Sequence, residues 1–313
     1  MVYTVDCSGI KPIESSKNGL ADKGIIVGCV SLSDFERLCP EWGFPDMCLE
    51  ACKANQRLFH NNVEVYDHFS YFFLRLLDVS CVRRERRETA VFIKKNMFLL
   101  VPLAGSDASF ERDFKKVIDH MEETFTVERL ISRLFLQWVE GSSLVMEQCE
   151  RQVLTMEENI WDNTIGSDFN RILLRMKNDL IIRQEFYDEL IAVAETIQAD
   201  DNNLFTDETF RHLKIAVKKL QRFGEKTRIL CESLVHVREA YQSAMDFRLN
   251  QIMKIFTVIT AIFLPLSLVA SWYGMNFIHM PELTWKYGYA GVAIISVIIV
   301  VVSIWIFKRK KWL

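Results

Sequence analysis

Hydrophobic residues in the first third of the chain come in short runs, rich in branched and aromatic side chains and bounded by turn or charged residues. Runs of this kind predict β-strands. The predicted strands cover residues 2–5, 25–30, 63–66, 69–77, 89–93 and 97–101. Between the second and third strands, Ser31 or Ser33 can cap a helix that ends at Leu38, and Pro45 can open another. We therefore expect an α/β domain with a mixed sheet over residues 1–105.

The hydrophobic pattern takes a helical period after residue 106, and no proline occurs between Pro102 and Pro265. Clusters of Gly, Ser, Asp and Asn at 141–143, 165–168 and 199–203 are the main breaks. They divide residues 107–273 into four predicted helices, of which the last begins with a candidate capping box at 206–209. Residues 106–203 are thus predicted to be a helical region that leads into one long helix.

Apolar residues recur along this last helix at spacings of three and four, with one longer step. They are Leu213, Val217, Leu220, Thr227, Leu230, Leu234, Val237, Tyr241 and Ala244. A continuous helix over residues 207–273 would be roughly 100 Å long, so residues 204–254 are predicted to form a stalk. The stripe needs a partner, either the preceding helices or the same helix in other copies, and we expect oligomerisation.

Two uncharged hydrophobic runs, 255–273 and 287–307, close the chain. Each matches the ~20 residues that a membrane-spanning helix needs, and the short loop 274–286 makes them a hairpin. Arg248 and Lys254 precede the first span, and a basic tail over residues 308–313 follows the second. Because positive residues stay on the cytoplasmic side, we expect a multi-pass protein of the cell (inner) membrane with both termini in the cytoplasm.

Composition agrees with a large cytoplasmic part. The first residues lack the basic start and apolar core of a secretory signal. Eight cysteines are scattered without a paired framework, as in proteins of a reducing compartment. The six histidines form no catalytic constellation, and no Gly-rich phosphate loop follows a strand. We therefore do not expect an enzyme.

A hairpin of two helices has no lumen, so a polar path would require several copies. The first span carries more hydroxyl and amide groups than the second and is therefore the predicted inner helix. Steps of three and four back from Asn276 define its predicted pore-lining face. This face consists of Ser271, Ser267, Leu264, Thr260, Phe256, Met253 and Asn250. Hydroxyls in membrane helices also often bond their own backbone, which is the alternative for each of them singly.

The end of the first span and the loop after it carry the most specific motifs. They read Tyr273-Gly274-Met275-Asn276-Phe277 and Met280-Pro281-Glu282-Leu283, and the chain ends in Lys310-Lys311-Trp312-Leu313. In these motifs, in Leu264-Pro265-Leu266 and in Val63-Glu64-Val65-Tyr66-Asp67, the chain resembles the CorA family of divalent-cation transporters over nearly its whole length.

The resemblance implies a homopentameric funnel, with the α/β domain in the cytoplasm, stalk helices around a pore, and Mg²⁺, sometimes Co²⁺ or Ni²⁺, as cargo. Its selectivity filter would be Gly274, Met275 and Asn276, where neutral Asn276 carbonyls hydrogen-bond the waters that Mg²⁺ sheds reluctantly. Gly274 would let the backbone turn without a side chain in the way. Glu282 would attract cations to the outer face. The expected partners are other copies, divalent cations and lipid, with no nucleic acid.

The resemblance also implies a hydrophobic gate at Met253 and Phe256, with Asn250 at the cytoplasmic entrance. An aliphatic residue is more usual in the family where this chain has Phe256. Relatives sense internal Mg²⁺ through acidic residues of the cytoplasmic part. The matching stalk position lies near Ile215, which is uncharged, so Asp207 and Glu208 are the candidate regulatory ligands.

Two other functions stay open at this point. A Zn²⁺ transporter of the same superfamily would share this architecture, although such relatives usually vary the Gly-Met-Asn triplet, which is intact here. A membrane-tethered scaffold or sensor would use the hairpin only as an anchor. An anchor has no need of Gly274 and Asn276 at an aqueous interface, so loss of Asn276 would then have no effect.

Overall fold

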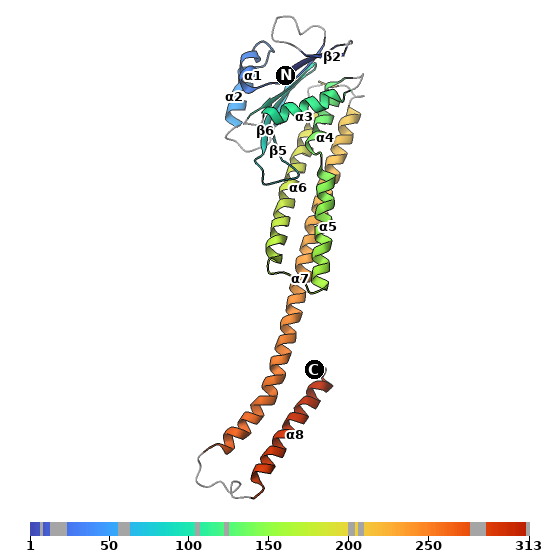
Figure 1. Cartoon of the computed structure of the whole chain (residues 1–313). Coiled ribbons are helices and arrows are strands. Elements are labelled where there is room, and N and C mark those ends of the chain that lie inside the picture. The colour runs from blue at the N-terminus through green and yellow to red at the C-terminus, as the bar shows by residue number, and fades with distance from the viewer. Residues whose placement is uncertain are drawn as a thin grey trace. The chain divides into compact units, whose positions relative to one another are not determined.

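The computed structural model describes residues 1–6, 9–12, 24–55, 63–103, 107–121, 125–199, 204–205, 210–275 and 286–310. The chain divides into two compact units, Met1–His236 and Val237–Leu313. The first unit is an α/β domain followed by helices, and the second contains the end of one long helix and a last apolar helix (Figure 1). This is the predicted fold class.

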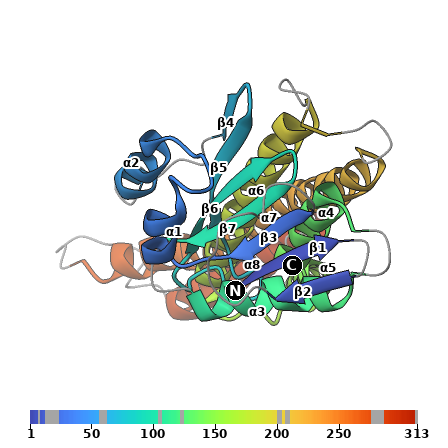
Figure 2. The same ribbon diagram turned by 90° about the horizontal axis from the view of Figure 1, so that it is seen from above.

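The first unit contains a mixed sheet of seven described strands (Figure 2). The strands are β1 (Val2–Asp6), β2 (Gly9–Pro12), β3 (Ile25–Cys29), β4 (Val63–Tyr66), β5 (Phe69–Leu76), β6 (Arg87–Lys94) and β7 (Met97–Pro102). Their order is β2-β1-β3-β7-β6-β5-β4. Among the described strands, only β3 and β7 pair in parallel, with Gly28 opposite Leu99. The six predicted strands are confirmed, whereas β2 was not predicted.

Successive side chains of a strand point to opposite faces of the sheet, and the central strands β5, β6 and β7 are buried on both faces. Helices cover both faces of the sheet accordingly. On one face, α1 (Leu32–Leu38) and α2 (Asp46–Asn55) enclose an aromatic core in which the Phe35 and Phe92 rings stack at 4.5 Å. On the other face, Phe98 stacks on Phe114 of α3 (Asp107–Asp119), with 6.4 Å between the ring centroids. The predicted cap is also present, since the Ser31 side chain accepts the Asp34 N–H.

The prediction of four helices between residues 107 and 273 was wrong, because the described residues of this stretch form five. They are α3, α4 (Val127–Trp138), α5 (Ser142–Trp161), α6 (Phe169–Ala199) and α7 (Phe210–Tyr273). The missed break separates α3 from α4, where the Thr126 hydroxyl caps α4 by accepting the Arg129 N–H at 3.3 Å. A threonine cap of this kind satisfies a free helical N–H without glycine or proline.

The apolar stripe on α7 is covered by the chain itself in the first unit. Its members Leu213, Leu220 and Leu234 are at most 1% exposed. The helices α5 and α6 supply cover: Thr227 contacts Met146 of α5, and the Phe223 ring stacks on Tyr187 of α6. Of the two partners left open by the sequence, the preceding helices are therefore the one observed. The stripe does not by itself require another copy.

Candidate ion pathway

The described part of the predicted filter is the end of α7. The helix ends at Tyr273, and the Gly274 N–H still donates to the Ala270 carbonyl oxygen at 3.0 Å. A Cβ atom added at Gly274 would lie 3.1 Å from the same oxygen, closer than side chains normally approach. Glycine therefore lets the chain leave the helix directly at its last turn. Met275 follows with a half-exposed side chain, whereas Asn276 and Glu282 lie outside the described residues.

The seven residues predicted to line a pore all have exposed side chains in the single chain. Met253, Phe256 and Leu264 are 62%, 62% and 65% exposed. With about 100° of rotation per residue, these positions and Ser267, Ser271, Thr260 and Asn250 fall on one side of α7. The structure thus groups the predicted residues on one helix face, and within a single chain this face has no cover.

A second stripe of α7 is covered, and it lies about half a turn around the helix from the first. Its centre is Val258, which is 7% exposed. The partly buried positions in the same stripe are Ile262, Pro265, Leu266 and Val269. Figure 1 shows α8 (Gly288–Arg309) running back beside this part of α7. The partly buried positions of α8 likewise form a stripe, which includes Val292, Ser296, Ile299, Ser303 and Phe307.

The hairpin therefore packs through one stripe of each helix and leaves the predicted pore face open. Both helices are long and apolar enough to cross a membrane. Sequence reasoning did not identify the packed stripe of α7, because every residue of this span is apolar or small and hydrophobicity cannot rank its faces. The four-residue spacing of the packed residues was no signal either, because the exposed residues Ile255, Ile259 and Phe263 have the same spacing.

Two hydroxyls of the first span bond their own helix. Thr260 Oγ1 donates to the Phe256 carbonyl oxygen at 2.9 Å, and Thr257 Oγ1 donates to that of Met253 at 2.8 Å. Ser296 of α8 does the same with Val292. A hydroxyl that donates to its backbone keeps its lone pairs as acceptors, so Thr260 can still present an oxygen to the hydration shell of a cation.

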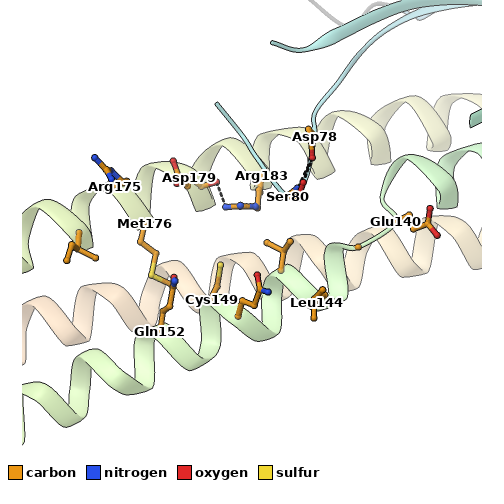
Figure 3. Close-up of a pocket in the computed structure, with 14 residues that line it drawn as sticks. Asp78, Ser80, Glu140, Leu144, Cys149, Gln152, Arg175, Met176, Asp179 and Arg183 are labelled. Carbon is orange, nitrogen blue, oxygen red and sulfur yellow. Dashed lines mark hydrogen bonds between the residues drawn. The ribbon is translucent and has the colours of Figure 1, made fainter. Parts of the chain in front are cut away.

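A cavity of about 490 Å³ lies in the first unit, between α5, α6 and the loop after β5 (Figure 3). Its lining includes the carboxylates of Asp78, Glu140 and Asp179, and the guanidinium of Arg183. Arg183 donates to the carbonyl oxygens of Val79 and Asp179. Apolar atoms of α5 and α6, among them Met176, complete the wall.

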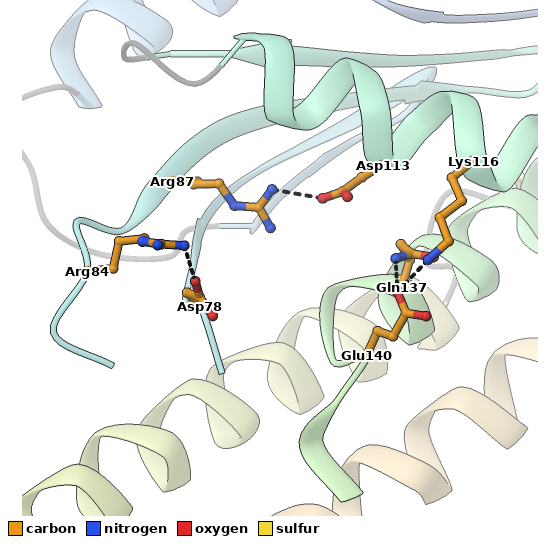
Figure 4. A network of polar contacts seen from close by, with 7 residues as sticks. All are labelled: Asp78, Arg84, Arg87, Asp113, Lys116, Gln137 and Glu140. Atoms are coloured by element: carbon orange, nitrogen blue, oxygen red, sulfur yellow. Dashed lines mark hydrogen bonds and ion pairs between the residues drawn. The ribbon is translucent and has the colours of Figure 1, made fainter. Parts of the chain in front are cut away.

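Each of the three cavity carboxylates pairs with a basic side chain of the same chain, and Figure 4 shows the pairs of Asp78 and Glu140. Arg84 pairs with Asp78 at 2.6 Å, Lys116 with Glu140 at 2.6 Å, and Arg83 with Asp179 at 3.5 Å. Burial acts to raise the pKa of Asp78, but hydrogen bonds from Ser80 and the charge of Arg84 bring that pKa below its ordinary value. The three carboxylates are therefore each paired with a basic side chain, and the lining also contains the guanidinium groups of Arg175 and Arg183.

The regulatory cation site expected from the sequence has no counterpart among the residues with described positions. Within them, no group of three or more His, Cys, Asp or Glu side chains is placed to hold a metal ion. Asp207 and Glu208 lie outside those residues. The stalk position Ile215 is 57% exposed, between Lys214 and Ala216.

Comparison with known proteins gives consistent results. The model of the family described as "CorA-like Mg2+ transporter protein" matches residues 29–309. The magnesium transport protein CorA of Wolinella succinogenes is 27% identical over 246 residues, which cover 78% of this chain and 76% of the relative. The cobalt/magnesium transport protein CorA of Thermotoga maritima is 24% identical, covering 80% and 72%. The complete CorA structure from Methanocaldococcus jannaschii superposes with a TM-score of 0.79 at 16% identity, covering 100% and 99%.

Proposed function

The chain belongs to the CorA-like Mg²⁺ transporter family, and on this premise we propose that it carries Mg²⁺ into the cell through a pore built from several copies. Relatives of the chain are named as magnesium or cobalt/magnesium transport proteins. Co²⁺ and Ni²⁺ are the secondary cargoes in this proposal. The proposed location is the inner membrane, with both termini in the cytoplasm, because the basic residues flank the spans on that side.

One observation carries the proposal: α7 has a face with Met253, Thr260 and Leu264 that α8 leaves uncovered, opposite its packed stripe. The same face carries the Asn250 amide, which water satisfies better than lipid does, and a single hairpin encloses no water. Copies arranged in a ring with this face inward would solve both problems. Five copies, the number implied by the family resemblance, is the proposed stoichiometry.

Selection in this proposal acts on the hydrated ion. Magnesium loses its waters reluctantly, so a ring of Asn276 amide oxygens would hydrogen-bond the hydration shell instead of replacing it. Neutral oxygens bind weakly enough to release the ion, as conduction requires. Glu282 would raise the local cation concentration through its field. A membrane potential of about 100 mV favours entry of a divalent ion by roughly 5 kcal/mol, since each charge contributes ~2.3 kcal/mol.

The gate in this proposal is the apolar part of the same α7 face. Met253 and Phe256 lie one turn apart there, and both side chains are exposed in the single chain. Rings of such side chains can close a pore by excluding water. Asn250 would form the polar cytoplasmic entrance. Asp207 and Glu208 stay the proposed ligands for feedback by internal Mg²⁺.

The proposed cargo can be tested by ion uptake into proteoliposomes that contain the full-length protein. We expect uptake of Mg²⁺ and inhibition by hexaamminecobalt(III), whose ligands do not exchange and which therefore mimics a hydrated ion. Uptake of Zn²⁺ without Mg²⁺ would favour the zinc transporter instead. Uptake of neither ion, at any internal Mg²⁺ concentration, would favour the membrane-tethered scaffold.

A further inference from the structure

The cavity of the first unit contains basic groups that the chain leaves without a counterion. Its carboxylates, those of Asp78, Glu140 and Asp179, are each paired with a basic side chain. The guanidinium groups of Arg175 and Arg183 also line the cavity. Neither guanidinium forms an ion pair with a residue that the structure describes. The cavity is therefore suited to an anion.

Arg183 is the more informative of the two arginines, because it is only 7% exposed. Its Nε and Nη1 groups donate to the carbonyl oxygens of Val79 and Asp179, at 3.2 and 3.1 Å, and both acceptors are neutral. Its Nη2 group makes no hydrogen bond to a described residue and is not enclosed by protein atoms. A guanidinium stays charged in proteins, and a buried charge without a counterion is unfavourable. The Nη2 group is thus a free donor on the cavity wall.

The ionisable groups described around Arg183 do not supply the missing anion. The Asp179 carboxylate is paired with Arg83 at 3.5 Å. Burial raises the pKa of the Cys149 thiol in the cavity wall, although the charge of Arg183 acts to lower it. Burial also raises the pKa of the Tyr187 hydroxyl, one turn beyond Arg183 on α6. Both groups are therefore neutral at physiological pH.

One end of the cavity adjoins the beginning of α5. Gly141 lines the cavity and precedes the helix in the left-handed conformation, with φ at 85°. Among the described residues, no side chain caps α5 there, and its first turn contains no acidic residue. The N–H groups and the dipole at the start of a helix favour an anion. This helix end therefore adds to the attraction that Arg183 provides.

We propose that the cavity binds a small organic phosphate, with Arg183 as the main contact to the phosphate group. A phosphate monoester carries about two negative charges at pH 7, which matches two unpaired guanidinium groups better than one carboxylate does. The planar guanidinium also suits the geometry of phosphate oxygens. The volume of about 490 Å³ is in the range of roughly 300–1,000 Å³ that small-molecule sites have. Leu144, Ile172 and Met176 provide an apolar wall for the organic part.

The two arginines have different roles in this site. Figure 3 shows Arg183 close to Asp179 and Ser80, with Arg175 further along α6. Arg175 is exposed and lies eight residues before Arg183, which is about 12 Å along the helix. Arg183 would contact the phosphate group, whereas Arg175 would act mainly through its electric field. Removal of Arg183 should therefore weaken binding much more than removal of Arg175.

Isothermal titration calorimetry of the full-length protein in detergent tests the site, with phenyl phosphate as the probe and no Mg²⁺ in the buffer. We expect phenyl phosphate to bind on the order of tenfold more tightly than inorganic phosphate, because its ring buries apolar surface. Arg183→Gln should weaken its binding at least about tenfold, the usual effect of losing a hydrogen bond to a charged group. Arg175→Gln should weaken it about twofold, and Arg183→Lys should keep part of the affinity.

A cavity-filling variant tests the site without changing a buried charge. Leu144 lines the cavity and is 56% exposed, so Leu144→Trp can fold normally while its ring occupies the space. We expect this variant to bind phenyl phosphate at least about tenfold more weakly. Leu154→Trp is the matched control, because Leu154 is on the same helix, is 53% exposed and lies outside the lining. It should bind like the unmodified protein.

Several results would overturn the proposal. They are the absence of phenyl phosphate binding, unchanged binding in Leu144→Trp, and equal losses in Arg175→Gln and Arg183→Gln, since equal losses would show a general effect of charge. Benzoate binding as tight as that of phenyl phosphate would contradict the preference for phosphate. The inference goes beyond the proposed transport and does not rest on it, because every readout is binding to the first unit.

Discussion

Hydrophobic residues are buried in one part of α7 and exposed in the other. In the first unit, Leu213, Leu220 and Leu234 are almost completely buried against helices of the same chain. In the second unit, Leu264 and Leu268 are 65% and 63% exposed, although the segment is more apolar. One helix thus begins in a core that the chain completes alone and ends in a surface that needs other surroundings.

The two units therefore differ in how much of their packing a single chain provides. The first unit buries its apolar side chains within the same chain, and many of its Arg and Lys side chains pair with carboxylates. In the second unit, one stripe of α7 packs against α8, and the remaining faces of both helices are apolar and exposed. Lipid can cover most of those faces, because hydrocarbon is as apolar as they are. The face with Thr260 and Asn250 is the one that other copies and water would cover.

Truncation of leucine should show the largest contrast. Leu220→Ala leaves a cavity in a core where the side chain is fully buried, and we expect it to lower the free energy of unfolding by about 2–5 kcal/mol. Leu268→Ala changes an open face and should cost under about 0.5 kcal/mol. Urea unfolding of the full-length protein in detergent, followed by circular dichroism, measures both. Equal losses would mean that Leu268 is packed in the assembled protein.

High pH should destabilise the first unit selectively. Burial raises the pKa of the Cys48 and Cys52 thiols to about 12, from an ordinary value near 9. A neutral thiol is favoured in the folded state, so this contribution is complete below pH 9 and is lost as pH rises from 9 towards 12. We expect a lower unfolding midpoint at about pH 10.5 than at pH 8.

The double variant Cys48→Ala/Cys52→Ala serves as the control for the alkaline experiment. It removes both thiols and should therefore have a smaller drop in midpoint between the two pH values. If the unmodified protein and the variant lost stability in parallel, the ionisation of other groups would explain the drop.

A smaller change is expected at the proposed gate. Phe256→Ala removes an exposed aromatic side chain from the predicted pore face, and Mg²⁺ leak into proteoliposomes should rise severalfold. Ile255→Ala is the matched control, because Ile255 lies at the same depth, is 60% exposed and points about 100° away around α7. A leak that rises equally in both variants would place the constriction elsewhere.

The smallest contrast concerns two threonines that make the same bond. Thr227 donates to the Phe223 carbonyl oxygen at 2.7 Å in the buried part of α7, and Thr260 donates to that of Phe256 at 2.9 Å in the open part. Thr227→Val should lower the free energy of unfolding by about 1 kcal/mol. Thr260→Val should change it by less than about 0.5 kcal/mol. The same urea titration resolves the difference, and the reverse order would contradict the assigned burial.

Much of the fold follows from the sequence, and the misses have physical reasons. Strand β2 (Gly9–Pro12) contains Gly and Pro and lacks an alternating pattern; it pairs only with β1 among the described strands, and Pro12 is tolerated at such an edge. The break between α3 and α4 depends on the Thr126 cap, which a search for Gly and Pro overlooks. Local signals of this kind are weaker than the hydrophobic periods that predicted the other elements.

The candidate pathway was predictable in a different way. Spacing from Asn276 placed Met253, Thr260 and Ser271 on one face, and the structure shows those residues together and exposed. Spacing could not show which face α8 covers, because both faces of the span are apolar. Spacing also could not identify the partner of the stalk stripe. An apolar stripe predicts that a helix face is buried, but it does not show which helix buries it.

The central claim is that hydrated Mg²⁺ passes a ring of Asn276 side chains. The most direct measurement compares Mg²⁺ uptake into proteoliposomes by the unmodified protein and by Asn276→Ala, at equal amounts of inserted protein. The account predicts uptake by the unmodified protein and at least about a tenfold loss in the variant, since the amide oxygens that hold the hydration shell are gone. Uptake by Asn276→Ala at the unmodified rate would contradict it.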